Sequence, residues 1–113
     1  MARLKVAPSK VSGTIGVPSS KSHSIRSLIF ASLAQGTSHL SNLLDSPDIQ
    51  RTIDACILLG AKIILNGRDA EVVGTGGAIT VPADIVDSGN SAPVLRFIGA
   101  LAALSDKATV ITG

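Results

Sequence analysis

Three short clusters of small polar residues constrain the fold of this chain more than any other feature of its sequence. Each cluster directly precedes an apolar stripe at helical spacing, and the three clusters are Ser19-Ser20, Ser46-Pro47-Asp48 and Asn90-Ser91. Serine and asparagine cap helix N-termini, proline suits the first turn, and an acidic residue there complements the helix dipole. The sequence therefore predicts three helices, of which the first spans about residues 20–34 and the second ends at Gly60.

Short apolar runs between these helices predict strands. The runs cover residues 11–17, 37–43, 61–65, 70–73, 79–81, 85–86 and 108–111. The Asn66-Gly67 dipeptide between two of the runs is typical of a hairpin turn. The order predicts an α+β fold, in which a two-layer βαβαββ unit over 1–84 has its helices on one face of a small mixed sheet. Residues 85–113 are expected to start a second such unit, so the chain is expected to be part of a longer protein.

The composition excludes several classes of protein. Phe30 and Phe97 are the only aromatic residues, so the core must be aliphatic and the stacking platforms of single-strand binding proteins are lacking. No apolar run is long enough to span a membrane, and the N-terminus has no secretory signal. The single cysteine, Cys56, cannot form a multi-thiolate metal site, and His23 and His39 have no partner at ligand spacing. We therefore expect a cytoplasmic protein without a metal or membrane partner, and the scarcity of aromatic residues counts against a nucleic-acid partner.

The charged residues are unevenly distributed along the chain. Residues 1–44 contain five basic and no acidic residues, whereas residues 45–113 contain five basic and all eight acidic residues. A cation-rich region without carboxylates suits anionic ligands such as phosphates, carboxylates or nucleic acid. The alternative interpretation is that these basic side chains are only solvated surface residues.

The densest polar motif, Ser-Ser-Lys-Ser-His-Ser-Ile-Arg-Ser, spans 19–27 at the start of the first predicted helix. Free backbone N–H groups at a helix N-terminus bind anions. Lys21, Ser22 and Arg26 would add an ammonium, a hydroxyl and a guanidinium group close to that end. The motif therefore predicts a site for a phosphate monoester or a carboxylate, although a serine-capped helix with two exposed bases would give the same pattern. It is not a P-loop, because Ser20 stands where that motif has glycine.

A second motif, Asp-Ser-Gly-Asn-Ser-Ala-Pro-Val-Leu-Arg, spans 87–96 at the start of the third predicted helix. It places small and amide side chains, including Asn90, where the helix begins. A simple capping turn explains this motif when it is taken alone. Together with the first motif, however, it suggests that two helix N-termini point at one ligand.

Four stretches occur in an order that resembles a known family. They are Val-Pro-Ser-Ser-Lys-Ser-His-Ser-Ile-Arg at 17–26, Leu-Leu-Asp-Ser-Pro-Asp at 43–48, Leu-Gly-Ala-Lys-Ile at 59–63 and Gly-Asn-Ser-Ala-Pro-Val-Leu-Arg at 89–96. Together they closely resemble the N-terminal part of the 3-phosphoshikimate 1-carboxyvinyltransferases, the EPSP synthases. The Lys-Ser-x-Ser-x-Arg element distinguishes them from the related UDP-N-acetylglucosamine enolpyruvyl transferases.

The resemblance implies a reaction and a set of binding residues. The family transfers the enolpyruvyl group of phosphoenolpyruvate to the 5-hydroxyl of shikimate 3-phosphate in aromatic amino acid biosynthesis, with no metal or organic cofactor. Lys21, Ser22 and Arg26 would bind shikimate 3-phosphate. Lys21 and Ala92 would contact phosphoenolpyruvate, and Asn90 belongs to the same turn as Ala92.

The resemblance also implies that much of the enzyme is absent. Family members fold into two domains of three βαβαββ units, and strand 11–17 would pair with the other domain. The acid–base groups would lie beyond Gly113, so no catalytic residue is expected in this chain, which would be inactive without the remainder of the enzyme as a partner. Ala92 and Pro93 stand where the family usually has glycine and threonine, and such an alanine is associated with lower glyphosate sensitivity.

Two other functions fit parts of the sequence. Residues 1–44 could form a non-catalytic module that binds phosphate or RNA, although the scarcity of aromatic residues and the eight acidic residues count against it. The chain could instead belong to the UDP-N-acetylglucosamine enolpyruvyl transferases, in which case a UDP-sugar would bind in preference to shikimate 3-phosphate.

Overall fold

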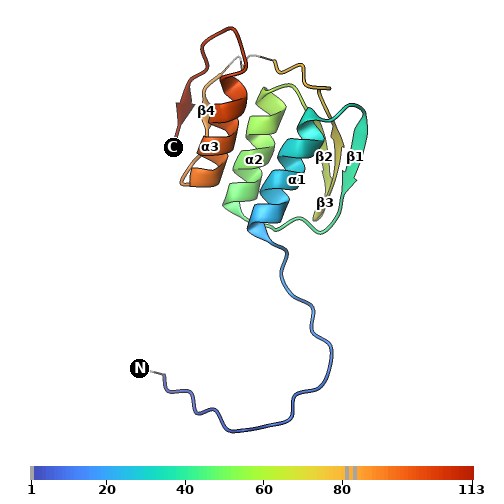
Figure 1. Ribbon diagram of the computed structural model, residues 1–113, viewed down its shortest axis with the longest axis vertical. Coiled ribbons are helices and arrows are strands. Elements are labelled where there is room, and N and C mark those ends of the chain that lie inside the picture. Colours follow the sequence, from blue (N-terminus) through green and yellow to red (C-terminus); the bar gives the residue numbers. More distant parts are fainter. Residues whose placement is uncertain (1, 81, 83) are drawn as a thin grey trace.

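Three parallel helices form one layer of the molecule (Figure 1). The computed structural model describes residues 2–80, 82 and 84–113. The helices are α1 (Lys21–Leu33), α2 (Pro47–Leu58) and α3 (Ala92–Ala102). They lie side by side and all begin at the same end of the molecule (Figure 1). Each begins directly after a capping serine, so the three predicted helices and their start points are confirmed.

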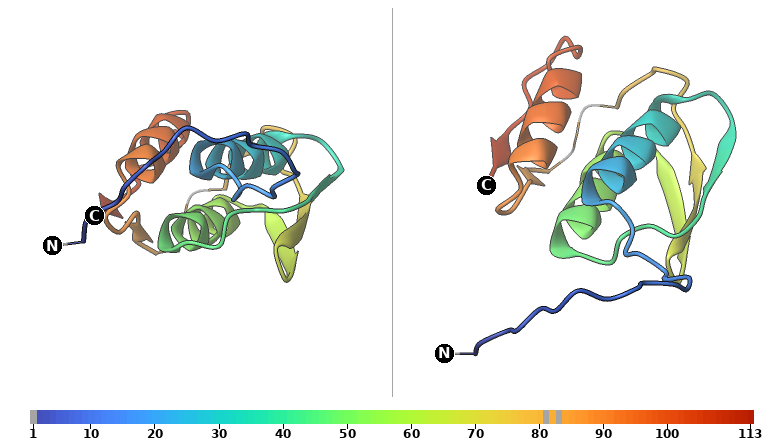
Figure 2. Two further views of the ribbon diagram at one scale, coloured as in Figure 1. Left: turned by 90° about the horizontal axis from the view of Figure 1, so that it is seen from below. Right: turned by 60° about the horizontal axis from the view of Figure 1, so that its bottom comes forward.

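The strands form two sheets, which confirms the predicted α+β class. The strands are β1 (Thr37–Leu40), β2 (Lys62–Asn66), β3 (Asp69–Val73), β4 (Val86–Asp87) and β5 (Ile111–Thr112). The first three form an antiparallel sheet in the order β1-β3-β2, and β4 and β5 form a parallel pair. Helices α1 and α2 pack on the three-stranded sheet, while α3 lies beside β4 and β5 (Figure 2).

The core between the helices and the sheet is aliphatic, as the composition predicts. Leu28 of α1 and Val72 of β3 are completely buried at its centre. The two aromatic side chains lie outside it, since Phe30 is 67% and Phe97 43% exposed. Cys56 is buried in this core, and burial raises the pKa of its thiol above the ordinary value because the charged thiolate is poorly solvated there.

The predicted hairpin between β2 and β3 is present, with its turn shifted by one residue. Asn66 pairs with Asp69, so Gly67 and Arg68 are the two turn residues. Gly67 has a φ of +61°, whereas Arg68 is not among the residues with positive φ. This sign pattern belongs to a type II′ turn, which places glycine at its first central position. Only Gly67 of the predicted dipeptide is therefore in the turn itself.

The strand predicted over 11–17 is wrong for the described part of the chain. Residues 2–19 form neither helix nor strand and run away from the packed body of the molecule (Figure 1). Val11, Ile15 and Val17 are between 78% and 93% exposed. Their apolar alternation suits a strand, but a strand needs a second edge for its backbone N–H and C=O groups, and no strand of the described chain pairs with them.

Three other predicted strands differ from the structure by more than one residue. The run over 37–43 ends as a strand at Leu40, because Asn42 adopts a left-handed φ of +58° and breaks the extended backbone. The final strand begins at Ile111 rather than at 108. In the run over 79–81, the first two residues are not in a strand and Val81 lies outside the described residues.

Candidate anion-binding site at the helix N-termini

The N-terminus of α1 carries the first predicted motif in a local geometry that suits an anion. Ser20 caps the helix, and its side chain accepts a hydrogen bond from the backbone N–H of His23 at 3.3 Å. The first turn contains no acidic residue. The partial positive charge of this helix end is therefore not offset by a carboxylate on α1 itself.

Lys21 does have a carboxylate partner, which the charge distribution along the sequence does not reveal. Its Nζ lies 2.8 Å from Oδ2 of Asp48 in the first turn of α2. The Lys21 side chain remains 49% exposed, and ion pairs at such sites contribute at most about 1 kcal/mol. Lys21 is thus positioned at the helix ends by a weak pair that a phosphate or carboxylate ligand can replace.

Ser22 and Arg26 lie together on a different side of α1. Both line a cavity of about 380 Å³ between α1 and α3, which Arg96 and Phe97 of α3 also line. The structure therefore brings Ser22 and Arg26 together, whereas Lys21 does not line this cavity and faces α2. Arg96 is a lining residue that the sequence prediction missed, although the occurrence of an arginine one turn inside both helices is a signal for it.

The second motif forms the N-terminus of α3, beside that of α1. Asn90 and Ala92 are exposed there. Ser91 is the capping residue, but its side chain makes no cap hydrogen bond, and its buried hydroxyl has no partner among the described residues. Pro93 in the first turn contributes to the missing cap hydrogen bond, because proline has no N–H group to donate to the Ser91 hydroxyl. At the start of α3, Ala92 therefore has a backbone N–H group whereas Pro93 has none.

Arg68 holds the segment that leads into α1. Its Nη2 donates to Oγ of Ser19 at 2.6 Å, and its Nε donates to the carbonyl of Leu43 at 3.0 Å. The hairpin turn is therefore connected both to the start of the first motif and to the loop before α2. Nothing in the sequence pattern indicates these contacts, since Arg68 and Ser19 are 49 residues apart.

Ser24 connects the same two segments from inside the molecule. Its hydroxyl donates to the carbonyl of Ser20 at 2.9 Å and accepts a hydrogen bond from the N–H of Leu44 at 3.0 Å. The side chain is buried, with 5% exposed. Ser24, the second serine of the Lys-Ser-x-Ser-x-Arg element, is therefore a buried residue that fixes the start of α1 to the loop before α2.

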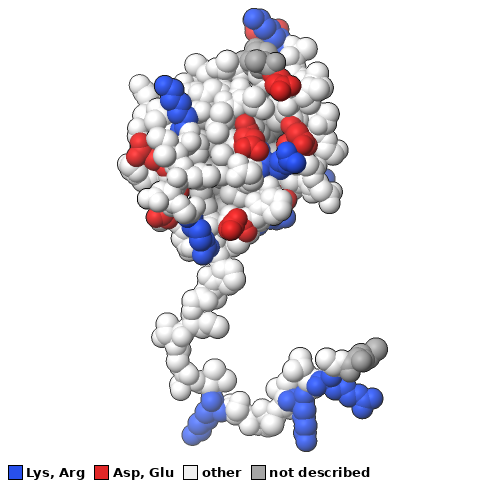
Figure 3. Space-filling model, turned by 180° about the vertical axis from the view of Figure 1, so that it is seen from behind, with Lys and Arg blue, Asp and Glu red and all other residues white. Residues whose placement is uncertain are grey.

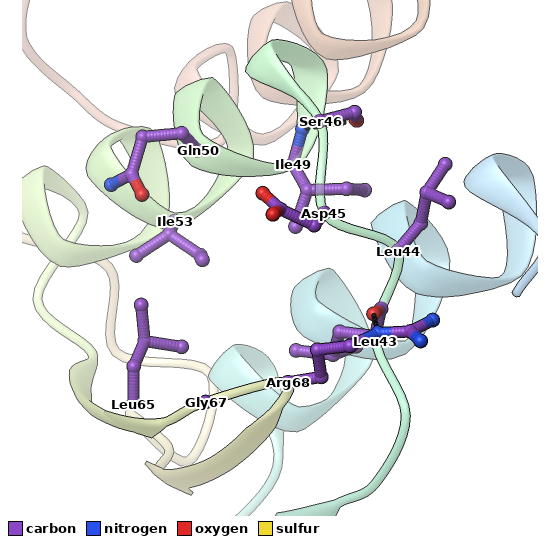
Figure 4. Close-up of a pocket in the computed structure, with 10 residues that line it drawn as sticks. All are labelled: Leu43, Leu44, Asp45, Ser46, Ile49, Gln50, Ile53, Leu65, Gly67 and Arg68. Carbon is purple, nitrogen blue, oxygen red and sulfur yellow. Dashed lines mark hydrogen bonds between the residues drawn. The ribbon is translucent and has the colours of Figure 1, made fainter.

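A separate cavity of about 290 Å³ opens beside this loop, with Arg68 and Leu43 at one wall (Figure 4). Ile49, Ile53 and Leu65 form the apolar part of its lining. None of the predicted ligand residues lines it. Two of the predicted ligand residues, Ser22 and Arg26, line the cavity between α1 and α3 instead.

Most of the basic residues of the first 44 lie away from both cavities. Arg3, Lys5 and Lys10 lie on the extended segment 2–19, which carries basic and no acidic side chains (Figure 3). Only Lys21 and Arg26 of the five are on the packed body. The predicted anion site would therefore depend on these two residues and the helix ends rather than on the net charge of the region.

The described residues contain neither a cluster of metal-ligating side chains nor a membrane-spanning helix. No three His, Cys, Asp or Glu side chains there lie close enough together to hold a metal ion. No helix of that part of the chain has the length and apolar character needed to cross a membrane.

Known proteins match this chain over nearly its whole length. The sequence model of the family EPSP synthase (3-phosphoshikimate 1-carboxyvinyltransferase) matches residues 6–113. The 3-phosphoshikimate 1-carboxyvinyltransferase of Chlamydia caviae is 45% identical over 114 residues, and that of Acetivibrio thermocellus is 46% identical over 110 residues. The alignments cover 100% and 97% of this chain but only 25% and 26% of those relatives.

Solved structures agree with the sequence matches. Two structures of EPSP synthase from Acinetobacter baumannii superpose on 89% of this chain with TM-scores of 0.78 and 0.82, at 30% and 29% identity. The superposition covers 23% of each of those chains, so this chain spans about a quarter of the proteins that it matches. The match of the family model, the curated relatives and the shared fold together place this chain in the EPSP synthase family.

Proposed function

We propose that this chain supplies the N-terminal part of an EPSP synthase and carries part of its shikimate 3-phosphate site. The reaction would move the enolpyruvyl group of phosphoenolpyruvate to the 5-hydroxyl of shikimate 3-phosphate. The observation that carries the proposal is the cavity at the start of α1, where Ser22 and Arg26 meet α3. Membership of the family supplies the identity of the ligands.

The chemistry of these side chains suits the anionic groups of the proposed substrates. An arginine binds a carboxylate or phosphate through two parallel hydrogen bonds, and such charge-assisted bonds are about twice as strong as neutral ones. Arg26 and the hydroxyl of Ser22 would hold shikimate 3-phosphate in the cavity that they line. Lys21 would lie at the edge of this region. Its ammonium group would leave the carboxylate of Asp48 and bind an oxygen of either substrate.

The turn before α3 would contribute to the phosphoenolpyruvate site. Asn90 and Ala92 are exposed at the N-terminus of α3, which begins at the same end of the molecule as α1 (Figure 1). The methyl group of Ala92 would border phosphoenolpyruvate and narrow the space available to the inhibitor glyphosate. The role of the described residues would be to bind and orient the two substrates, which lowers the entropy cost of bringing them together.

Other groups of the enzyme would have to move protons and stabilise the tetrahedral intermediate, because catalysis requires interactions that strengthen in the transition state. The partner that supplies them would be the remainder of an EPSP synthase, to which this chain contributes about a quarter of the length. We place this function in the cytoplasm.

A titration of the 113-residue chain with shikimate 3-phosphate, followed by NMR of its backbone amides, tests the site. We expect saturable shifts at Lys21, Ser22 and Arg26, and weaker shifts with shikimate, which lacks the phosphate. Absence of shifts at millimolar ligand would contradict the proposal. Binding of RNA through residues 2–19, with strong salt dependence and no competition by shikimate 3-phosphate, would favour the RNA-binding alternative instead.

A further inference from the structure

The loop between β4 and α3 is held by one carboxylate that uses both of its oxygens. Oδ1 of Asp87 accepts a hydrogen bond from the N–H of Gly89 at 2.8 Å, and Oδ2 lies 2.8 Å from Nη1 of Arg51 on α2. Gly89 has a φ of +54°, a left-handed backbone conformation that residues other than glycine rarely adopt. Asp87 therefore fixes the turn internally and connects it to α2.

Arg51 also supports this turn by direct packing. A Cβ atom built on Gly89 would lie 3.1 Å from Nε and 3.5 Å from Cγ of Arg51. The arginine stem therefore lies against the backbone at the point where the chain turns toward Asn90. The ion-pair atoms belong to side chains that are 43% and 50% exposed, so the pair contributes little to the stability of the fold. Its main effect is on the position of the loop.

Helix α2 thereby contacts both predicted ligand segments through neighbouring side chains. Asp48 pairs with Lys21 at the start of α1, and Arg51 pairs with Asp87 before α3. Residues three apart on a helix lie on the same side of it. The first turns of α2 therefore contact both the start of α1 and the segment before α3. The sequence motifs did not single out α2 for any such role.

We infer that Arg51 is a positioning residue that holds the loop of residues 87–91 in the orientation required to bind phosphoenolpyruvate. The inference rests on the proposed function, because it assigns that ligand to the turn of Asn90 and Ala92. Arg51 would act through Asp87 and Gly89 without contacting the ligand. When the guanidinium is removed, the loop loses its connection to α2, and its backbone donors spend less time in the binding orientation. The hydrogen bonds from the N–H and the hydroxyl of Ser88 to the carbonyl of Thr112 remain.

The test compares Arg51→Met, which keeps much of the side-chain length but not the charge, with Arg51→Lys. Separate NMR titrations with phosphoenolpyruvate and shikimate 3-phosphate would report Kd from the amides of Ala92 and Ser22. We expect Arg51→Met to weaken phosphoenolpyruvate binding by about twofold to fivefold, because the pair of Arg51 with Asp87 is exposed and weak and acts only on the position of the loop. Binding of shikimate 3-phosphate should stay unchanged. Arg51→Lys should restore most of the lost affinity, since it can still pair with Asp87.

Three results would overturn the inference. The first is an equal loss of affinity for both ligands in Arg51→Met, which would indicate a general structural effect. The second is unchanged backbone ¹⁵N relaxation of residues 88–91 in that variant, because a positioning role requires the loop to become more mobile. The third is a wild-type chain that binds shikimate 3-phosphate but shows no phosphoenolpyruvate shifts at Ala92. This last result would leave the proposed phosphoshikimate site intact, whereas failure of both ligands to bind would contradict the proposed function itself.

Glu71→Gln is the matched control for these titrations. Glu71 lies opposite His39 on the three-stranded sheet, with 3.8 Å between Oε2 and Nδ1, and it lines neither the α1–α3 cavity nor the loop before α3. Its loss should leave both affinities and the relaxation of residues 88–91 unchanged. A change as large as that of Arg51→Met would contradict a specific role for Arg51.

Discussion

Lys21→Met and Arg26→Met are each expected to weaken the binding of shikimate 3-phosphate by about tenfold to one-hundredfold, because each removes a charge-assisted hydrogen bond. Neither substitution should lower thermal stability appreciably. The pair of Lys21 with Asp48 is partly exposed, and Arg26 forms no ion pair within the described residues. Isothermal titration calorimetry gives the affinities, and circular dichroism melting curves give the stabilities.

Lys62→Met is the matched control for these two variants. Lys62 is an exposed residue of β2 that lines neither the α1–α3 cavity nor the one beside Arg68, and its loss changes the net charge by the same amount. The control should bind shikimate 3-phosphate as the unmodified chain does. An equal loss in all three variants would show that binding depends on overall charge and not on the N-terminus of α1.

Gly74→Ala is expected to cause the largest loss of stability among substitutions that add a single methyl group. Gly74 follows β3 and donates its N–H to the carbonyl of Gly36 at 2.9 Å. A Cβ atom there would collide with the carbonyl oxygens of Ala31 and Ala34 at the end of α1. Both are backbone atoms that cannot rotate away. Overpacking of this kind costs about 1–3 kcal/mol or more, and the melting temperature should fall by on the order of 10 °C.

Gly16→Ala provides the comparison for this experiment. Gly16 lies in the extended segment, has no atom within 4 Å of an added Cβ and does not have a positive φ. Its substitution should change the free energy of unfolding by less than about 0.5 kcal/mol. Equal melting temperatures for the two alanine variants would show that β3 and the end of α1 are not packed as described.

Local chemistry explains why the helices were predictable. A capping serine and an apolar stripe act within a few residues of one another, so Ser20, Ser46 and Ser91 mark the starts of α1, α2 and α3 correctly. The hairpin is equally local, although the sequence does not distinguish which two of its residues form the turn. The shift to Gly67 and Arg68 follows from the pairing of whole strands rather than from the dipeptide alone.

Non-local pairing explains what the sequence did not reveal. The alternation over 11–17 indicates which side chains share a face but not which edge they pair with. The pairing of segment 11–17 with a strand of another domain stays a prediction. The division of the chain into the units 1–84 and 85–113 also stays a prediction. The pair of Lys21 with Asp48 joins residues 27 apart, so a count of charges along the chain places them in different regions. Ser22 and Arg26 line one cavity with α3 whereas Lys21 pairs with Asp48 of α2, and this division became evident only from the packing.

The most direct test of the central claim is to let this chain replace the matching part of a complete relative. The Acetivibrio thermocellus enzyme is suitable, since it is 46% identical over 110 residues that make up 26% of its length. The fusion should release phosphate from phosphoenolpyruvate when shikimate 3-phosphate is present, whereas the 113 residues alone and the fusion with Lys21→Met should not. A folded fusion that binds phosphoenolpyruvate but neither binds shikimate 3-phosphate nor releases phosphate would contradict the claim that this chain carries the phosphoshikimate-binding part of an EPSP synthase.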